Sequence, residues 1–145
     1  MSEEIEKEIT AKLTKNGVVV EDSDSVSELV AKGFGVKEDG SLILKDFEAL
    51  YLMYVKKLTV SKGGRSLTFN EMVDYALKRD PEAWTRFIVY RDLRSRGYTV
   101  KDGFGFGVDF RVYERGEHPS KPAKYLVFSL NEGSKKIVNK FSKSV

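Results

Sequence analysis

The spacing of apolar residues changes near Gly97, and this change constrains the fold more than any other feature of the sequence. Before Gly97, apolar residues recur three and four positions apart, which is typical of amphipathic helices. After Gly97 they alternate with polar residues, as in strands that have one buried face. Short strands are also expected between the helices of the first half. The pattern therefore predicts an α+β or α/β fold.

Four helix starts are predicted from residues that cap backbone N–H groups or favour a first turn. They are Ser25 with Glu28, Asp46, Thr68 with Glu71, and Asp80 with Pro81. The first helix is expected to stop at Gly33 and the last at Gly97, because glycine readily adopts the left-handed conformation that ends helices. Helical spacing extends the second helix as far as Leu58.

Strands are predicted where turn residues bound short apolar or alternating runs. They cover residues 41–44, 98–100, 108–113 and 125–128. The continuous apolar run of the last segment favours a central strand that is covered on both faces. Residues 103–107, which include three glycines, are expected to form a flexible turn or a bulge. Residues 134–145 have the pattern of a basic helix without a stop signal, which favours a final lobe that is incomplete in the sequence.

Composition excludes several kinds of chemistry. The chain has no cysteine and one histidine, so disulfides, thiolate metal sites and thiol nucleophiles are excluded. No apolar run reaches the ~18–20 residues that span a bilayer. The acidic opening residues do not match a signal or transit peptide, and a cytoplasmic location is therefore expected.

Charge is distributed unevenly along the chain. Residues 1–50 carry 6 Lys+Arg and 12 Asp+Glu, whereas residues 51–145 carry 19 and 10. A basic C-terminal part fits a polyanionic partner such as nucleic acid, because cations that neutralise phosphates release counterions. Charge that serves only to keep a small protein soluble produces the same imbalance. Both interpretations stay open at this point.

Polar side chains collect on one face of the strand predicted at residues 108–113. Alternation places Asp109, Arg111 and Tyr113 together on that face. A magnesium-dependent nuclease site centred on Asp109 is one hypothesis, but the next strand offers Lys124 without an adjacent acid. The glycines before this strand lack the spacing, lysine and following helix of a phosphate-binding loop. Taken alone, Tyr113 fits an ordinary half-buried strand tyrosine.

Three consecutive stretches resemble the archaeal tRNA-intron endonuclease family. VYRDLRSRGYTVK at residues 89–101 is similar to the passage from helix to strand in that family's catalytic domain. GFGFGVDFRVYERG at residues 103–116 is similar to the strand that leads to its catalytic tyrosine. KYLV at residues 124–127 resembles its next core strand. The resemblance covers residues 84–141 well, and the N-terminal part agrees in the order of its elements.

The resemblance implies a reaction that needs no metal or other cofactor. The family cleaves precursor tRNA at bulge-helix-bulge junctions and leaves 2′,3′-cyclic phosphate and 5′-hydroxyl ends. A tyrosine takes the proton of the ribose 2′-OH, a histidine protonates the leaving 5′-oxygen, and a lysine stabilises the transition state. Because the nucleophile is already in the RNA, the protein has only to move protons and balance charge.

These roles transfer to the chain only in part. Tyr113 matches the position of the catalytic tyrosine. The family histidine stands three residues before the tyrosine of the YLV strand, where this chain has Pro122, which cannot transfer a proton. His118 lies nearby as a substitute acid, although the sequence favours a solvated loop histidine. The segment that holds the family lysine would begin where the printed sequence stops.

The resemblance also implies an architecture and partners. Residues 1–80 are expected to form a small N-terminal αβ domain. Residues 81–145 are expected to form an incomplete nuclease-like domain, with a mixed sheet flanked by helices. Pro122 favours a structural subunit that works beside a separate catalytic subunit in a dimer of dimers. The candidate contacts to the RNA phosphates are Arg111, Arg115, Lys121 and Lys124.

Two other functions remain as alternatives. One is a non-enzymatic RNA- or DNA-binding module that keeps only the fold. The other is the magnesium-dependent nuclease centred on Asp109. A cut at intron junctions that needs no magnesium and requires a partner subunit would separate the leading hypothesis from both.

Overall fold

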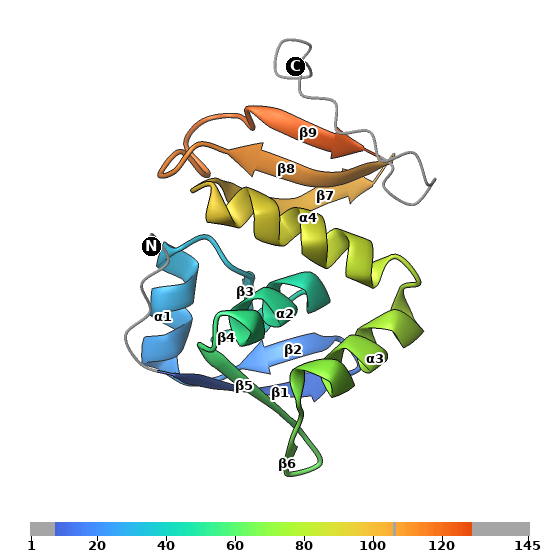
Figure 1. The fold of residues 1–145 in the computed structure, drawn as a ribbon. Helices are drawn as coiled ribbons and strands as arrows, with labels where there is room; N and C mark the ends of the chain where they lie inside the picture. Colours follow the sequence, from blue (N-terminus) through green and yellow to red (C-terminus); the bar gives the residue numbers. More distant parts are fainter. Residues whose placement is uncertain (1–7, 106, 129–145) are drawn as a thin grey trace. The chain divides into compact units, whose positions relative to one another are not determined.

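The computed structural model describes residues 8–105 and 107–128, which form an α+β fold as the sequence predicts (Figure 1). The chain divides into two compact units between Phe87 and Ile88, within helix α4. The strands are β1 Ile9–Thr14, β2 Gly17–Val20, β3 Val36–Glu38, β4 Ser41–Leu44, β5 Leu58–Lys62, β6 Arg65–Ser66, β7 Thr99–Gly105, β8 Val108–Tyr113 and β9 Tyr125–Phe128. The helices are α1 Ser23–Ala31, α2 Asp46–Tyr54, α3 Phe69–Arg79 and α4 Ala83–Ser95. None of these helices is long and apolar enough to cross a membrane.

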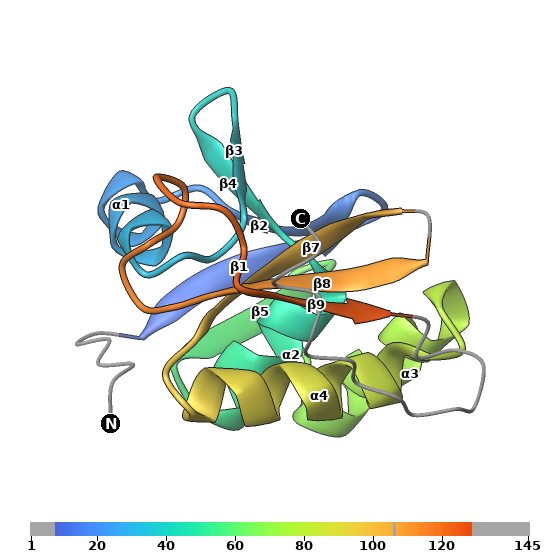
Figure 2. The same cartoon turned by 90° about the horizontal axis from the view of Figure 1, so that it is seen from above.

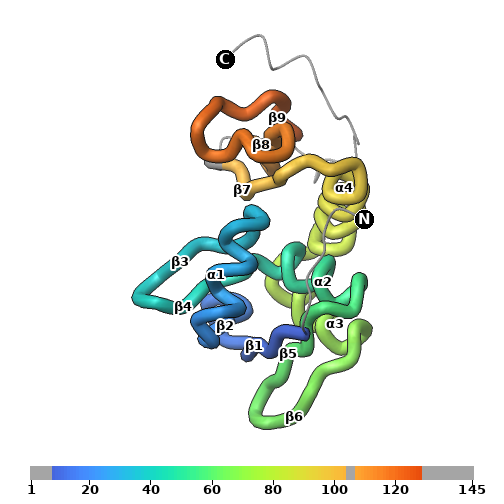
Figure 3. Tube along the Cα trace, turned by 90° about the vertical axis from the view of Figure 1, so that its left-hand side faces the viewer, coloured from blue at the N-terminus to red at the C-terminus, as the bar shows by residue number. Residues whose placement is uncertain are grey.

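Unit 1 contains a mixed sheet in which the described strands have the order β3-β4-β2-β1-β5-β6. Only β1 and β5 run parallel, and the other neighbouring pairs are antiparallel. The hairpins β3–β4 and β5–β6 form the two edges of this sheet (Figure 3). In Figure 2 the tip of the β3–β4 hairpin extends beyond helix α1. Both edges of unit 1 therefore end in exposed hairpins.

The core of unit 1 lies between the sheet and the helices. Burial alternates along β1, where Ile9, Ala11 and Leu13 face inward. Helix α2 packs on β2 and β5, and α1 packs on β4. Glu48 of α2 is buried, and its carboxylate accepts hydrogen bonds from the backbone N–H groups of Gly35 and Lys45 at 2.8 Å each. A buried carboxylate with both of these donors fixes the chain on each side of the β3–β4 hairpin.

The helix starts follow the sequence prediction in one case and differ by a few residues in the others. Thr68 and Glu71 form the predicted capping box of α3, in which each side chain accepts a hydrogen bond from the other residue's backbone N–H. The cap of α1 is Asp22, whose carboxylate accepts a hydrogen bond from the backbone N–H of Ser25. The predicted cap at Ser25 was therefore wrong, because a better acceptor lies three residues earlier. The predicted stop is confirmed, since α1 ends before Gly33.

Helix α2 differs from the prediction at both ends. Lys45 holds the cap position, and Asp46 is the first helical residue instead of the cap. The helix ends at Tyr54, and Leu58 begins strand β5. The predicted helix was too long because a buried residue such as Leu58 fits the apolar spacing of a helix as well as the buried face of a strand. The left-handed backbone at Lys56, with φ of 63°, turns the chain before that strand.

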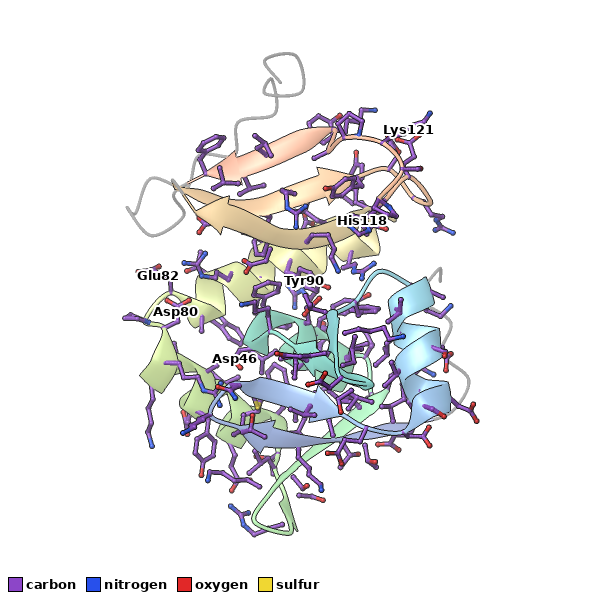
Figure 4. The ribbon with its side chains drawn as sticks, turned by 180° about the vertical axis from the view of Figure 1, so that it is seen from behind. Asp46, Asp80, Glu82, Tyr90, His118 and Lys121 are labelled. Atoms are coloured by element: carbon purple, nitrogen blue, oxygen red, sulfur yellow. The ribbon has the colours of Figure 1, made fainter. Side chains whose placement is uncertain are left out.

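Helix α4 begins at Ala83, later than the predicted start at Asp80. Asp80 has an extended backbone, and its carboxylate joins the end of α3 to the start of α4. Oδ1 accepts a hydrogen bond from the backbone N–H of Glu82 at 2.9 Å, and Oδ2 accepts one from Arg86 Nε at 2.7 Å. Figure 4 shows Asp80 and Glu82 in this connection. The chain leaves the helix at Gly97, as predicted, with φ of 95°.

Unit 2 contains an antiparallel sheet with the described strand order β7-β8-β9. The predicted bounds of β8 and β9 are confirmed. Among the described strands β9 pairs only with β8, and Val127 is its only buried residue. Within the described residues β9 is therefore an edge strand, where the sequence predicted a central strand covered on both faces. The mixed sheet thus lies in unit 1, whereas the described strands of unit 2 are all antiparallel. The helix expected at residues 134–145 lies outside the described residues.

The glycine-rich segment is part of strand β7 up to Gly105, where the sequence predicted a flexible turn or a bulge. The pairing with β8 shifts between Asp102 and Gly105, which marks a bulge. A Cβ atom on Gly103 would lie 2.0 Å from the carbonyl oxygen of Val108. Glycine is therefore required by the close approach of two strands, and the segment does not act as a loop for phosphate.

Candidate active site and RNA-contact residues

One polar face of the β7–β8 hairpin carries the candidate catalytic tyrosine. Arg111 and Tyr113 alternate with Phe110 and Val112, both of which are fully buried on the opposite face. The antiparallel register places Lys101 of β7 opposite Arg111. This local arrangement follows from alternation, as the sequence predicts.

Tyr113 is held inside a hydrogen-bonded group. Only 6% of its surface is exposed. Its hydroxyl oxygen accepts a hydrogen bond from Arg111 Nη1 at 2.9 Å, and Arg111 Nε donates to the carbonyl oxygen of Asp102 at 2.7 Å. The guanidinium also lies 6.0 Å from the centre of the Tyr113 ring. Arg111 therefore links the bulge of β7 to the phenol, and it stands where it would stabilise negative charge on the phenol oxygen.

His118 packs against Tyr113 from the connection between β8 and β9. The ring centres are 4.8 Å apart and the planes meet at 80°, an edge-to-face contact. His118 lies in a loop, as expected, and it is half-buried there. Burial lowers the pKa of His118 below its usual range, and the nearby cations Lys101 and Arg111 lower it further. The imidazole is therefore mainly neutral at pH 7.

The other candidate cations lie on the surface of unit 2. Lys124 Nζ forms an ion pair with Glu114 at 2.5 Å, and this carboxylate raises the pKa of the lysine. Lys121 pairs with Glu117 at 3.7 Å. In Figure 4, Lys121 and His118 both belong to the β8–β9 connection. Exposed ion pairs are weak, so a phosphate can replace the carboxylate at little cost.

Arg115 and Pro122 are exposed in the same connection. The structure thus groups Arg111, Tyr113 and His118, and it leaves Arg115, Lys121 and Lys124 outside that group. Asp109 lies on β8, but no cluster of three or more His, Cys, Asp or Glu side chains that would hold a metal occurs in residues 8–105 and 107–128. The magnesium hypothesis therefore has no ligand group in the described part of the chain.

Sequence reasoning missed the contributions of strand β7 to this site. Asp102 supplies the carbonyl group that orients Arg111, and Lys101 adds positive charge near His118. The register that places Lys101 opposite Arg111 depends on the bulge between Asp102 and Gly105, and the strand predicted at residues 98–100 did not extend that far. The Tyr113–His118 contact had no comparable signal, because it depends on how residues 114–124 fold.

Two sequence models of one family match the chain. The model for the tRNA intron endonuclease N-terminal domain matches residues 9–73. The model for the tRNA intron endonuclease catalytic C-terminal domain matches residues 83–145. Each match falls largely within one compact unit, so unit 2 corresponds to a domain of the catalytic type.

Curated relatives agree with this assignment. A tRNA-splicing endonuclease from Methanococcus vannielii is 39% identical over 127 residues, which cover 87% of this chain and 72% of the relative. One from Thermococcus gammatolerans is 40% identical over 126 residues, which cover 85% of this chain and 73% of the relative. The chain belongs to the tRNA intron endonuclease family, and the resemblance seen in the sequence is confirmed.

Proposed function

We propose that the chain is a subunit of an enzyme that cuts precursor tRNA at bulge-helix-bulge intron junctions. The family supports cleavage of tRNA introns as the activity. The reaction leaves a 2′,3′-cyclic phosphate and a 5′-hydroxyl group and uses no metal. In this reaction the ribose 2′-oxygen attacks the adjacent phosphorus, and the bond to the 5′-oxygen breaks. One group removes the 2′-OH proton and another protonates the 5′-oxygen, so only proton transfer and charge balance are required of the protein.

Within this enzyme, the chain acts as a structural subunit beside a catalytic partner, in a dimer of dimers. The observation that carries this proposal is the engagement of the Tyr113 phenol, which is buried and hydrogen-bonded to Arg111. A base must reach the ribose hydroxyl, and a phenol that is almost fully covered does not. Pro122 at the position of the family histidine supports the same role, since proline cannot donate a proton.

The chain contributes to RNA binding through the cations of unit 2. The β8–β9 connection exposes Arg115, Lys121 and Lys124. Lys121 and Lys124 each form an ion pair with one surface carboxylate. Phosphate contacts fix the position of an RNA without reading its sequence. Such contacts would help to present the intron junction to the catalytic partner.

The edge-to-face contact of Tyr113 with His118 favours a second candidate, in which the chain cuts RNA by itself. His118 would then replace the family histidine as the acid, and Arg111 would stabilise the phenolate. The lowered pKa of His118 works against this role at neutral pH, because few molecules carry the proton to be donated. The second candidate therefore predicts activity that rises as the pH falls below 7.

Cleavage of a bulge-helix-bulge RNA in EDTA tests both candidates. The chain is assayed alone and with a catalytic tRNA-splicing endonuclease subunit, and the RNA ends are identified. The structural role predicts cutting only in the mixture, with 2′,3′-cyclic phosphate ends. Cutting by the chain alone, abolished by His118→Gln, would establish the second candidate. RNA binding without cutting in either case would leave only a binding module, and cutting that appears only in a parallel assay with magnesium would contradict both candidates.

A further inference from the structure

The tip of the β5–β6 hairpin in unit 1 is open and flanked by two cations. Gly63 and Gly64 form the tip with φ of 59° and 82°, the positive values required by a tight hairpin turn. A Cβ atom at either position would have no neighbour within 4 Å. Lys62 and Arg65 stand directly opposite each other across the two strands.

Like charges that face each other across a strand pair repel. Of Lys62 and Arg65, only Arg65 has a carboxylate that offsets its charge. Arg65 forms an ion pair with Glu71 of α3 at 3.3 Å. Lys62 forms no ion pair among the described residues, and its ammonium nitrogen lies 5.7 Å from the centre of the Tyr75 ring. Lys62 thus keeps an exposed positive charge that an external anion can neutralise.

Helix α3 adds a third cation to the same place. The ammonium nitrogen of Lys78 lies 5.4 Å from the centre of the Tyr75 ring. Lys78 also forms no ion pair in the described part of the chain, although Asp74 lies one helical turn away. We call Lys62, Arg65, Tyr75 and Lys78 the Tyr75 cluster. Its ring holds two exposed lysine side chains in place without neutralising them.

We propose that the Tyr75 cluster binds backbone phosphates of the RNA substrate and forms a second RNA-contact surface in unit 1. Phosphate neutralisation by two unpaired lysines gains free energy from counterion release. The bare glycine tip lets a nucleic acid backbone approach closely. Ser66 of β6 and Asn70 of α3 are exposed and polar, and Leu77 of α3 is a large apolar side chain that is 38% exposed. This inference rests on the proposed function, because it assigns the substrate of that function to a further surface.

The test is the binding of a fluorescently labelled bulge-helix-bulge RNA to the full chain, measured by anisotropy at several salt concentrations. The test variant is Lys62→Gln with Lys78→Gln, which removes two charges and keeps long side chains. The matched control is Lys15→Gln with Lys37→Gln, which removes two exposed, unpaired lysines elsewhere in unit 1. Thermal unfolding of each variant shows that the fold is kept.

The proposal predicts that the test variant binds severalfold more weakly at low salt than the control. The slope of log affinity against log salt concentration should become shallower by about 1.4–1.8, because each lost phosphate contact removes about 0.7–0.9. The control should keep the slope of the unaltered chain. Equal slopes for both variants would overturn the proposal and leave the proposed function intact.

Two further outcomes would also decide the question. Loss of assembly with the catalytic subunit in the test variant, with RNA binding unchanged, would assign the Tyr75 cluster to a protein interface and overturn the proposal. Failure of the unaltered chain to bind this RNA at all would contradict the proposed function itself.

Discussion

Each unit of the chain holds cations against a tyrosine ring, and the two arrangements differ in exposure and in partners. In unit 2, Tyr113 is 6% exposed and bonded to Arg111, which also binds a backbone carbonyl. In unit 1, Tyr75 is half-buried, and the two lysines near it have no ion pair among the described residues. The polar groups around Tyr113 hydrogen-bond to one another, whereas the two lysines beside Tyr75 keep positive charge that can bind an anion. This difference supports the framework role proposed for Tyr113 and the ligand-contact role proposed for the Tyr75 cluster.

The largest expected effect on stability comes from removing each ring. Tyr113→Ala should lower the free energy of unfolding by about 3–5 kcal/mol, because it leaves a cavity and removes the partner of Arg111. Tyr75→Ala should lower it by less than about 1 kcal/mol, because the ring is partly exposed. Urea unfolding of both variants measures the difference. Equal losses would remove the distinction between the two tyrosines.

Removing only the hydroxyl groups sharpens the comparison. Tyr113→Phe should cost about 1–2 kcal/mol, because Arg111 Nη1 loses its acceptor in a covered site. Tyr75→Phe should leave stability unchanged, since that hydroxyl makes no hydrogen bond within the described residues. The same urea experiment applies. A neutral result at Tyr113 would mean that water replaces the phenol as the partner of Arg111.

A smaller effect is expected from pH through His118. The folded protein holds this proton less tightly than the unfolded chain, because burial and two cations lower the pKa of the imidazole. Its contribution to stability is therefore complete above the ordinary pKa of 6.5 and is lost as the pH falls through the lowered value. His118→Gln should flatten the stability curve between about pH 7 and pH 5. An unchanged slope, measured by thermal unfolding across this range, would place the imidazole in solvent.

The smallest effects concern single surface lysines and differ in sign. Lys62→Gln should stabilise unit 1 slightly at low salt, because it removes the repulsion with Arg65. Lys124→Gln should destabilise unit 2 slightly, because it breaks the ion pair with Glu114. Both differences should disappear at high salt, where exposed charges are screened. Equal signs at low salt would show that Lys62 has a carboxylate partner in solution.

Local signals in the sequence account for much of the fold. The capping box at Thr68, the bounds of β8 and the stop at Gly97 depend on neighbouring residues and could be predicted. Leu58 was assigned to a helix because an apolar residue at helical spacing is also suited to a buried strand. The edge hairpin β3–β4 was only partly predicted, since none of the residues of β3 is buried and its sequence has no apolar pattern.

The candidate site was less predictable than the fold. Alternation placed Arg111 beside Tyr113, but it did not show that the two are hydrogen-bonded. His118 reaches Tyr113 through a connection without regular structure, and such contacts have no periodic signature. The Tyr75 cluster was missed because Lys62 and Lys78 lie 16 positions apart on a strand and a helix. Residues that meet only through tertiary structure leave no spacing pattern in a single sequence.

We propose that Tyr113 supports the enzyme without performing its chemistry. The most direct test is the single-turnover rate at which the assembled enzyme, formed by this chain and a catalytic subunit, cuts a bulge-helix-bulge RNA in EDTA. If Tyr113 has only a supporting role, Tyr113→Phe in this chain should change the rate by less than about twofold. A fall of about a hundredfold or more, the size expected for losing an acid or base catalyst, would contradict it.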